Sequence, residues 1–364
     1  MSKLKQKVKK IPNLKIRSFS LLKAFLILLI ILISIVLINI LMAFSSSKNG
    51  TSINNSSKSN QSDISITQEK ARWTSGIKQF GATKEYEKFK QEFSQKDFNT
   101  QHLASHLFGY VLYDTVGING VTVCDSSFSF GCYHGFFTNA ISTNGLSIVP
   151  KIEEACSNKF GQSHASPCRH GIGHGLVEYL GHASDKIPIA LKACQAKTNE
   201  PGQTQFFGCY TGVFMEYFQQ IIITGKTPTF LQKPLDPKHP YDICPNLDKV
   251  FRTPCYFQIV QWWQQVYNYD YQKIGYLCEN IQNPDEKTAC FEGAGNTIGP
   301  STNFDYKLAS QTCEKLNYHD GVVLCKGAAA RTISAQPTLS DTATHTCDGL
   351  EGQDYLTCVN YTKI

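Results

Sequence analysis

The fourteen cysteines of this 364-residue chain all lie after residue 120 and follow one another in close pairs. The first members of successive pairs are 32, 38, 50, 34, 35 and 34 residues apart, a spacing that indicates an internal repeat with one insertion. The seven pairs are Cys124/Cys132, Cys156/Cys168, Cys194/Cys209, Cys244/Cys255, Cys278/Cys290, Cys313/Cys325 and Cys347/Cys358. This repeat constrains the fold strongly, because every unit must accommodate the same two cysteines.

Each repeat has the same order of segments. An amphipathic segment ends in a cysteine, as in KIEEAC and IALKAC, a polar loop follows, and a second segment opens with a cysteine, as in GCYHGF and PCRHGI. This order predicts a helical hairpin in which the two cysteines lie within disulfide reach across the turn. We therefore expect seven disulfides between sequence neighbours. A zinc alternative would need C-x2-C knuckles, and the sequence has none.

A glycine follows the second cysteine by three positions in four of the repeats, in GCYHG, PCRHG, GCYTG and ACFEG. Because glycine has no side chain, it lets a neighbouring helix approach closely, at some cost in helix propensity. We therefore expect these glycines at contacts between helices.

This arrangement resembles the cysteine-rich helical-hairpin repeats of some secreted bacterial proteins, which are relatives of tetratricopeptide arrays. The residues that carry the resemblance are Ala-Cys at 155–156 and 193–194, Gly-Cys at 131–132 and 208–209, and NFDYKLASQTCEKL at 303–316. The resemblance covers residues 120–364 and concerns the architecture. It implies an all-α fold, an α-solenoid of about seven helical hairpins, with a binding surface rather than a catalytic mechanism.

Ahead of the repeats, a basic tail runs into a long apolar segment. Residues 1–23 carry eight Lys and Arg and no acidic residue, and the 21 residues at 24–44 carry no charge. A helix of that length would be about 31 Å long, enough to cross a bilayer core and too long for the apolar region of a signal peptide. The positive flank should stay in the cytoplasm. We therefore expect a single-pass anchor in the cell membrane, with everything after residue 44 outside.

The cysteines and the charge distribution narrow the class of partner. Cysteines pair in an oxidising compartment, which favours an extracytoplasmic helical-repeat domain at 67–364 on a flexible Ser/Asn-rich stalk at 45–66. Without the eight positive charges of the tail, the net charge of +6 becomes −2 for residues 24–364. That body lacks the basic footprint of a nucleic-acid-binding protein. The expected partners are the membrane, through the N-terminal helix, and a protein or carbohydrate ligand on the repeat surface.

Two further stretches are candidates for ligand contact. The aromatic segment CYFQIVQWWQQVYNYDY contains Tyr256, Trp262, Trp263 and Tyr267, whose rings stack on sugars in some proteins but at helical spacing more often belong to a core. The second stretch is an insertion at 222–243, which contains four prolines. Since proline interrupts regular helix, this insertion is expected to be a long loop, either a lid over a groove or a tolerated excursion.

Five of the ten histidines have positions that indicate a metal site. Two pairs are four residues apart and so share one helix face, and two members occupy the same repeat slot, two residues after the second cysteine. Because equivalent helices of a repeat array stack side by side, we expect the five imidazoles to converge. Neutral imidazoles bind zinc, copper or iron, and the ligand type alone does not choose among them. The five are His102, His106, His134, His170 and His174. The histidines expected at the surface are His164, His182, His239, His319 and His345.

Three functions remain open. The first is a binding module that holds a transition-metal ion through these five histidines. The second is a metal-dependent enzyme in which Glu178, one turn beyond His174, or a metal-bound water acts as a base, although the H-E-x-x-H pattern of metalloproteases is absent. The third is a protein-interaction solenoid without metal, in which the histidines only pack. Glu216 in FMEYF is a weaker candidate, either a carboxylate in a groove or an exposed helix charge.

Overall fold

The structure is a computed structural model, and it describes residues 66–161, 166–195, 206–222, 228–336 and 338–363. These residues belong to one compact unit, Asp63–Ile364. The basic tail, the expected membrane helix at 24–44 and the stalk up to residue 65 lie outside the described residues. Within the described ranges, no helix is both long enough and apolar enough to cross a membrane.

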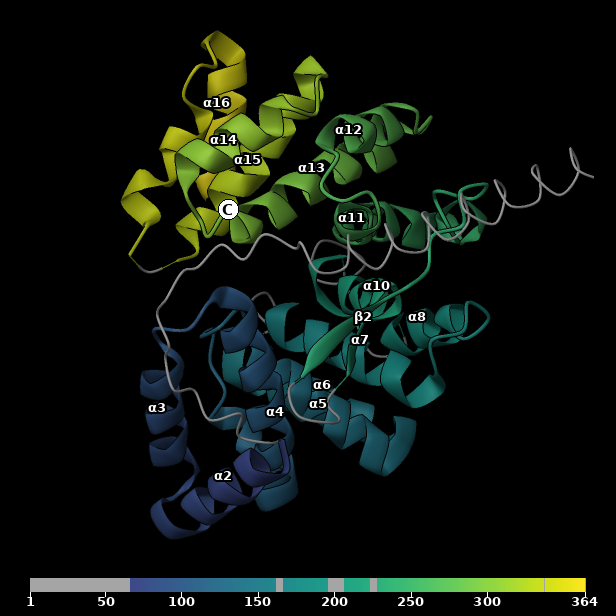
Figure 1. Ribbon diagram of the computed structural model, residues 1–364. Coiled ribbons are helices and arrows are strands. Elements are labelled where there is room, and N and C mark those ends of the chain that lie inside the picture. Colours follow the sequence, from purple (N-terminus) through teal and green to yellow (C-terminus); the bar gives the residue numbers. More distant parts are fainter. Residues whose placement is uncertain (1–65, 162–165, 196–205, 223–227, 337, 364) are drawn as a thin grey trace, which may run out of the picture. The chain divides into compact units, whose positions relative to one another are not determined.

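The described part of the chain is all-α apart from one small β-hairpin (Figure 1). Its first elements are α2 (Ile66–Phe80), α3 (Ala82–Phe93), α4 (Phe98–Val116) and the 3-10 helix η1 (Gly117–Thr122). Next come α5 (Gly131–Asn144), η2 (Gly145–Ile148), α6 (Val149–Phe160), α7 (Ser166–Leu180), α8 (Ile187–Gln195), the π-helical turn η4 (Phe206–Tyr210) and α10 (Thr211–Phe218). The last group is β1 (Gln219–Ile222), β2 (Thr229–Gln232), η5 (Cys244–Asn246), α11 (Lys249–Val266), α12 (Tyr271–Glu279), α13 (Pro284–Ser301), α14 (Tyr306–Glu314), α15 (His319–Ser334), η6 (Ser340–Cys347), α16 (Gly352–Asn360) and η7 (Tyr361–Lys363).

All fourteen cysteines lie in described segments, and they form seven disulfides between the expected sequence neighbours, with Cα–Cα distances of 5.5–5.9 Å. The predicted pairing is therefore confirmed in every repeat. The bridges are Cys124–Cys132, Cys156–Cys168, Cys194–Cys209, Cys244–Cys255, Cys278–Cys290, Cys313–Cys325 and Cys347–Cys358.

The hairpins around these bridges are less regular than expected. The bridges join two α-helices in the pairs α6/α7, α12/α13 and α14/α15. In three of the other repeats the first cysteine does not lie on an α-helix. Cys124 lies in a loop, and Cys244 and Cys347 lie on 3-10 helices. A disulfide needs two close α-carbons and not a particular helix type, so the repeat tolerates this variation.

The prediction that the second cysteine of each pair opens its helix is confirmed only in part. Cys132 and Cys168 are the second and third residues of α5 and α7, whereas Cys209 lies in η4, ahead of α10. In the other four repeats the prediction was wrong, because the helix begins six residues before its cysteine. These four are Cys255 in α11, Cys290 in α13, Cys325 in α15 and Cys358 in α16. Helix α13 illustrates the reason: Asn283 caps it by accepting two backbone N–H groups, and so the helix begins inside the segment expected to be a loop.

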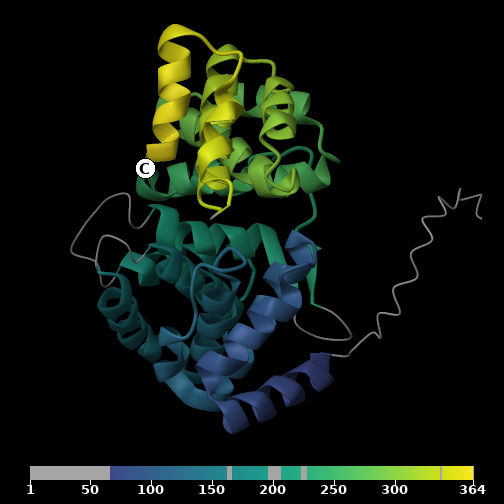
Figure 2. The ribbon, with the colours of Figure 1, turned by 90° about the vertical axis from the view of Figure 1, so that its left-hand side faces the viewer.

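The second helix of each repeat packs on its counterpart in the next repeat. Helix α5 contacts α7, α7 contacts α10, and the series continues through α11, α13 and α15; α4, which precedes the first repeat, contacts α5. At the C-terminal end, α15 also contacts α14 and α16, which are yellow-green and yellow in Figure 2. A continuous cluster of buried residues extends from Ile66 to Ala343. It contains Tyr256, Trp262 and Trp263, so these rings belong to the core and not to an exposed sugar-stacking face.

Close backbone approach explains the repeated glycine. A β-carbon at Gly135 would overlap the carbonyl oxygen of His106, and one at Gly212 would overlap the carbonyl oxygen of His170. The next equivalent glycine, Gly293, meets a backbone carbonyl of α11 in the same way. Only a residue without a side chain lets these helices approach so closely. The glycines therefore hold α4 against α5 and α7 against α10, which are contacts beside the predicted histidines.

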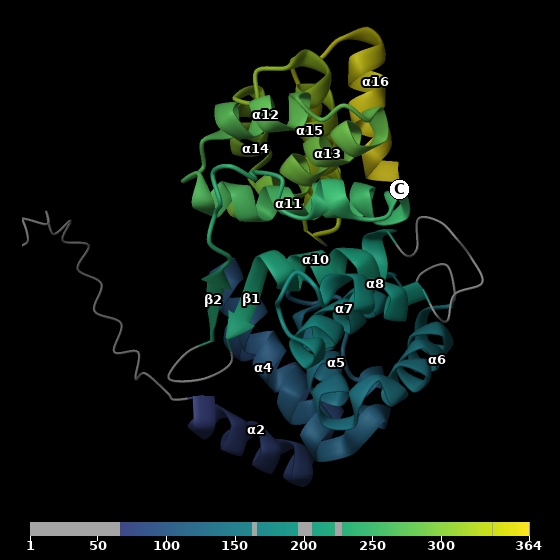
Figure 3. The same ribbon diagram turned by 90° about the vertical axis from the view of Figure 1, so that its right-hand side faces the viewer.

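The insertion at 222–243 contains regular structure. Strand β1 pairs with β2 in an antiparallel ladder that aligns Gln219 with Gln232 and Ile222 with Thr229 (Figure 3). The residues between the strands, 223–227, lie outside the described ranges. Prolines flank β2 and do not interrupt it, and so they remove no hydrogen bond from the ladder. The described part of the insertion contains no α-helix, as expected, and the segment predicted as a long loop includes strand β2.

Candidate metal centre

The five predicted histidines converge between three helices. His102 and His106 lie on α4, His134 lies on α5, and His170 and His174 lie on α7. The centroids of neighbouring imidazole rings are 4.7–5.9 Å apart. His170 is partly exposed, and the other four residues are at most 6% exposed. We call these five residues the histidine cluster.

Two groups of three histidines within the cluster have ligand atoms close enough to share an ion. One nitrogen from each of His102, His106 and His134 lies within 4.8 Å of the others, and the same holds for His134, His170 and His174. In the first group, Nε2 of His106 is 3.1 Å from Nε2 of His102 and 3.1 Å from Nδ1 of His134. Two nitrogens on one tetrahedral zinc ion are about 3.3 Å apart, given metal–nitrogen bonds of about 2.0 Å. The observed spacing is close to that value.

The ring of His102 is fixed by a backbone acceptor. Helix α4 begins after Asp97, whose carboxylate caps it by accepting the N–H of Thr100 at 3.0 Å. One turn later, Nδ1 of His102 lies 2.8 Å from the carbonyl oxygen of Phe128. A carbonyl only accepts, so the neutral ring carries its proton on Nδ1. The lone pair of Nε2 is therefore free on the side that faces His106.

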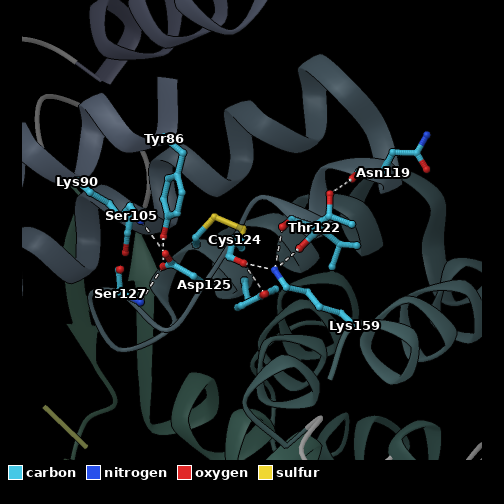
Figure 4. The surroundings of a disulfide bond; sticks show 12 residues. Tyr86, Lys90, Ser105, Asn119, Thr122, Cys124, Asp125, Ser127 and Lys159 are labelled. Carbon is cyan, nitrogen blue, oxygen red and sulfur yellow. Dashed lines mark hydrogen bonds and ion pairs between the residues drawn. A yellow bond between two sulfur atoms is a disulfide. The ribbon is translucent and has the colours of Figure 1, made fainter. Parts of the chain in front are cut away.

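The loop that supplies this carbonyl is held in place by several contacts (Figure 4). The first disulfide of the chain closes it. Asp125 in the loop accepts from the hydroxyl of Tyr86 at 2.9 Å and from Nζ of Lys90 at 2.8 Å. Three consecutive residues from Phe128 have φ between 52° and 62°, a left-handed run that is costly for residues with side chains. This strained backbone lies where the loop meets His102.

A hydroxyl holds His170 in the corresponding way. Nδ1 of His170 lies 2.9 Å from Oγ1 of Thr211, and that hydroxyl donates to the carbonyl of Gly208 at 3.0 Å. A hydroxyl has one proton, so Nδ1 of His170 is the donor and Nε2 carries the lone pair. Thr211 occupies, in its own repeat, the slot that His134 and His170 occupy in the two repeats before it. In this repeat the slot therefore holds a threonine that fixes the His170 ring, rather than a further histidine.

His174 has a carboxylate partner. Its Nδ1 donates to Oε2 of Glu216 at 2.8 Å, and the two side chains are 1% and 4% exposed. Glu216 also accepts from Nε2 of His182 at 3.1 Å and from the N–H of Ile221 at 3.2 Å. Nε2 of His174 is buried and has no hydrogen-bond partner among the described residues. A histidine whose far nitrogen is free while a carboxylate orients the ring is typical of metal sites.

Burial keeps most of the cluster neutral. It lowers the pKa of His102 to about 4. Burial also opposes ionisation of Glu216, but the hydrogen bonds from His174 and His182 outweigh it, and the pKa of Glu216 is lowered. Neutral imidazoles beside a buried carboxylate form a donor set suited to a cation. Burial likewise lowers the pKa far below the ordinary histidine value for His106, His134 and His170.

Glu178, the expected general base, belongs to neither group of three histidines. It forms a separate group with His182 and Glu216, whose ligand atoms lie within 4.8 Å of one another. The Glu178 side chain is 33% exposed, and burial of the rest raises its pKa. A catalytic role for Glu178 stays a prediction.

Glu216 and His182 are the residues that the sequence pattern placed least well. Glu216 is a buried partner of His174, and neither an exposed charge nor a lone carboxylate in a groove. His182 was expected at the surface, but its side chain is only 24% exposed and bonds to Glu216. Three others, His239, His319 and His345, have side chains that are 52–74% exposed, as predicted, and His164 lies outside the described residues. A pairing across two helices leaves no periodic signal in either one.

No protein-family model, curated protein or solved structure significantly matches the chain. The fold and the site therefore define its class by themselves: an all-α, disulfide-bonded helical protein with a buried histidine cluster. The resemblance to secreted helical-hairpin repeats extends as far as this helical architecture with its seven disulfides.

Proposed function

We propose that the chain is a membrane-anchored, extracytoplasmic helical-repeat module that binds a transition-metal ion in its histidine cluster. The observation that carries this proposal is the anchoring of three rings. The Nδ1 protons of His102, His170 and His174 all bond to fixed acceptors, so Nε2 of each neutral ring is left with a lone pair. This is how proteins fix the tautomer of a metal-binding histidine. The candidate ions are zinc, copper and iron.

Packing alone accounts less well for the same contacts. Nε2 of His106 lies 3.1 Å from two other ring nitrogens, and the one on His102 is already unprotonated. With neutral rings, only one of these two contacts can be a good hydrogen bond. A buried polar atom left unsatisfied costs about 1–3 kcal/mol, and Nε2 of His174 adds another such atom. A cation in the group of His102, His106 and His134 removes the first conflict, and one in the group of His134, His170 and His174 gives Nε2 of His174 a partner.

The extracytoplasmic location rests on the disulfides. Fourteen cysteines paired without remainder are typical of proteins that mature in an oxidising compartment. The uncharged segment at 24–44 and its basic flank support a single-pass anchor with the repeats outside. The consecutive contacts from α4 to α15 support a solenoid whose outer faces take a protein or carbohydrate partner.

Metal analysis of the full-length protein tests the metal-binding proposal. The protein is purified in detergent with its disulfides intact and dialysed against zinc, copper or iron. We expect a stoichiometric amount of at least one ion, and loss of that ion in the double variant His134→Ala/His174→Ala, because His134 belongs to both groups of three histidines. The matched control is His319→Ala/His345→Ala, two exposed histidines, which should keep the metal. No bound ion in the wild-type protein would leave packing as the account of the cluster.

A further inference from the structure

Met215 brings a sulfur atom to the edge of the histidine cluster. The chain has three methionines, and Met215 is the only one after residue 42. It lies on α10, and its Sδ is 3.3 Å from Nε2 of His170. Both side chains are partly exposed, whereas the other four histidines of the cluster are buried. Met215 and His170 therefore lie at the solvent-facing end of the cluster.

The contact between these two side chains is not a hydrogen bond. Nδ1 of His170 carries the proton of the ring, because the hydroxyl of Thr211 gives its own proton to Gly208. Nε2 of the neutral ring then has only a lone pair, and a thioether sulfur has no proton to donate. Two lone pairs thus face each other at 3.3 Å. A cation bound by both atoms makes this arrangement favourable.

We propose that the histidine cluster is a site for monovalent copper and that Met215 is one of its ligands, beside His170. This inference rests on the metal-binding function proposed above and names its ion. Thioether sulfur is a soft donor that suits Cu(I), whereas protein zinc sites use thiolate, imidazole and carboxylate ligands. All fourteen cysteines are in disulfides, so no thiolate competes with Met215 as the soft ligand.

The partial exposure of the pair fits a role at the point of entry. A copper ion that arrives from solvent meets Met215 and His170 before it reaches the buried nitrogens of His134 and His174. His134, His170 and His174 already form one of the two groups with ligand atoms within 4.8 Å. The thioether therefore extends an existing imidazole site toward solvent.

Competition titrations of the full-length protein test the inference. Cu(I), kept monovalent by ascorbate, is titrated against a bicinchoninate chelator, and Zn(II) is titrated against a zinc-binding dye. Met215→Leu keeps a similar apolar volume, so the fold should be retained. We expect it to lower the Cu(I) affinity at least about tenfold, since losing even an indirect partner of a metal ligand has that effect. The Zn(II) affinity should not change. Met42→Leu, the same exchange elsewhere in the chain, should alter neither affinity.

The outcomes separate this inference from the proposed function. X-ray absorption of the Cu(I)-loaded protein should contain a copper–sulfur component that disappears in Met215→Leu. Equal Cu(I) affinity in the wild type and in Met215→Leu, with no copper–sulfur component, overturns the role of Met215. The metal-binding proposal then stands if His170→Ala still weakens binding of either ion. If neither ion binds the wild-type protein, both proposals fail.

Discussion

Nδ1 of His174 and Oε2 of Glu216 are 2.8 Å apart, and the two side chains are almost completely buried. The bond joins α7 to α10 across 42 residues of sequence. It fixes the proton of His174 on Nδ1 and leaves Nε2 with a lone pair that can bind a metal ion. This nitrogen has no hydrogen-bond partner in the described part of the chain. This pair therefore links the packing of two repeats to the chemistry of the histidine cluster.

We predict that Glu216→Gln weakens metal binding about 10- to 100-fold, because the oriented carboxylate partner of a metal-binding histidine contributes on this scale. The amide keeps the volume of the side chain but loses the charge that polarises the His174 ring. Chelator competition measures the change. Glu154→Gln, at an exposed position of α6, is the control and should bind as the wild type does. An unchanged affinity in Glu216→Gln would mean that His174 is not a ligand.

We predict that the metal-free protein loses stability on acidification between pH 6.5 and about 4. Burial lowers the pKa of His102 from 6.5 to about 4, so the unfolded chain takes up this proton first as the pH falls. The contribution of the neutral His102 ring to the free energy of unfolding is fully present above pH 6.5 and is lost as the pH falls toward 4. For this residue it is on the order of 3 kcal/mol. Urea unfolding at several pH values across this range measures the free energy of unfolding.

A substitution series identifies the origin of that acid sensitivity. His102→Gln should reduce the slope of stability against pH, whereas His239→Gln, at an exposed position, should leave it as in the wild type. If His102→Gln and the wild type lose stability in parallel, the buried neutral ring is not the cause.

We predict that two disulfides of similar loop size differ in their effect on the site. Cys156–Cys168 and Cys347–Cys358 span 12 and 11 residues, so replacing either pair with serine should cost about 3 kcal/mol of stability. Only the first replacement should also weaken metal binding, because Cys168 lies on α7 shortly before His170. Denaturation and metal titration of both variants provide the comparison. Equal metal affinities in the two variants would argue against this local coupling.

We predict that Gly135→Ala destabilises the protein by about 3 kcal/mol, the scale of overpacking, and weakens metal binding. The new β-carbon would overlap the carbonyl of His106 and push α5 away from α4. Gly161→Ala is the control. It has φ of +74° and ψ of 161°, and no described residue lies within 4 Å of the added β-carbon, so it should cost about 1–3 kcal/mol of strain and leave the site intact. Thermal unfolding together with metal titration distinguishes a displaced site from a merely weakened fold.

The five members of the histidine cluster could be predicted because their signal is periodic. In two pairs the histidines are four residues apart, and His134 occupies the same repeat slot as His170. The partners of the cluster carry no such signal. Glu216, Thr211 and Met215 all lie on α10, which has no histidine. Each bonds to or contacts a ring on another helix, and only the packing of α10 on α7 brings them together.

The same contrast holds for the fold. The seven disulfides could be predicted because each closes a short loop between sequence neighbours. The helix starts ahead of Cys255, Cys290 and Cys325 could not, because cysteine spacing does not encode where a helix begins. The irregular parts depend on distant contacts. The strained run at Phe128 is held by Asp125 and its partners on α3, and the β1–β2 ladder forms although prolines flank its second strand.

Anomalous X-ray scattering tests the central claim most directly. Crystals of the full-length protein saturated with copper or zinc are measured at the absorption edge of that metal. The account predicts an anomalous peak at about 2 Å from imidazole nitrogens of the histidine cluster. The nitrogens belong to His102, His106 and His134, or to His134, His170 and His174. A peak elsewhere on the protein, or no peak in the saturated crystals, would contradict it.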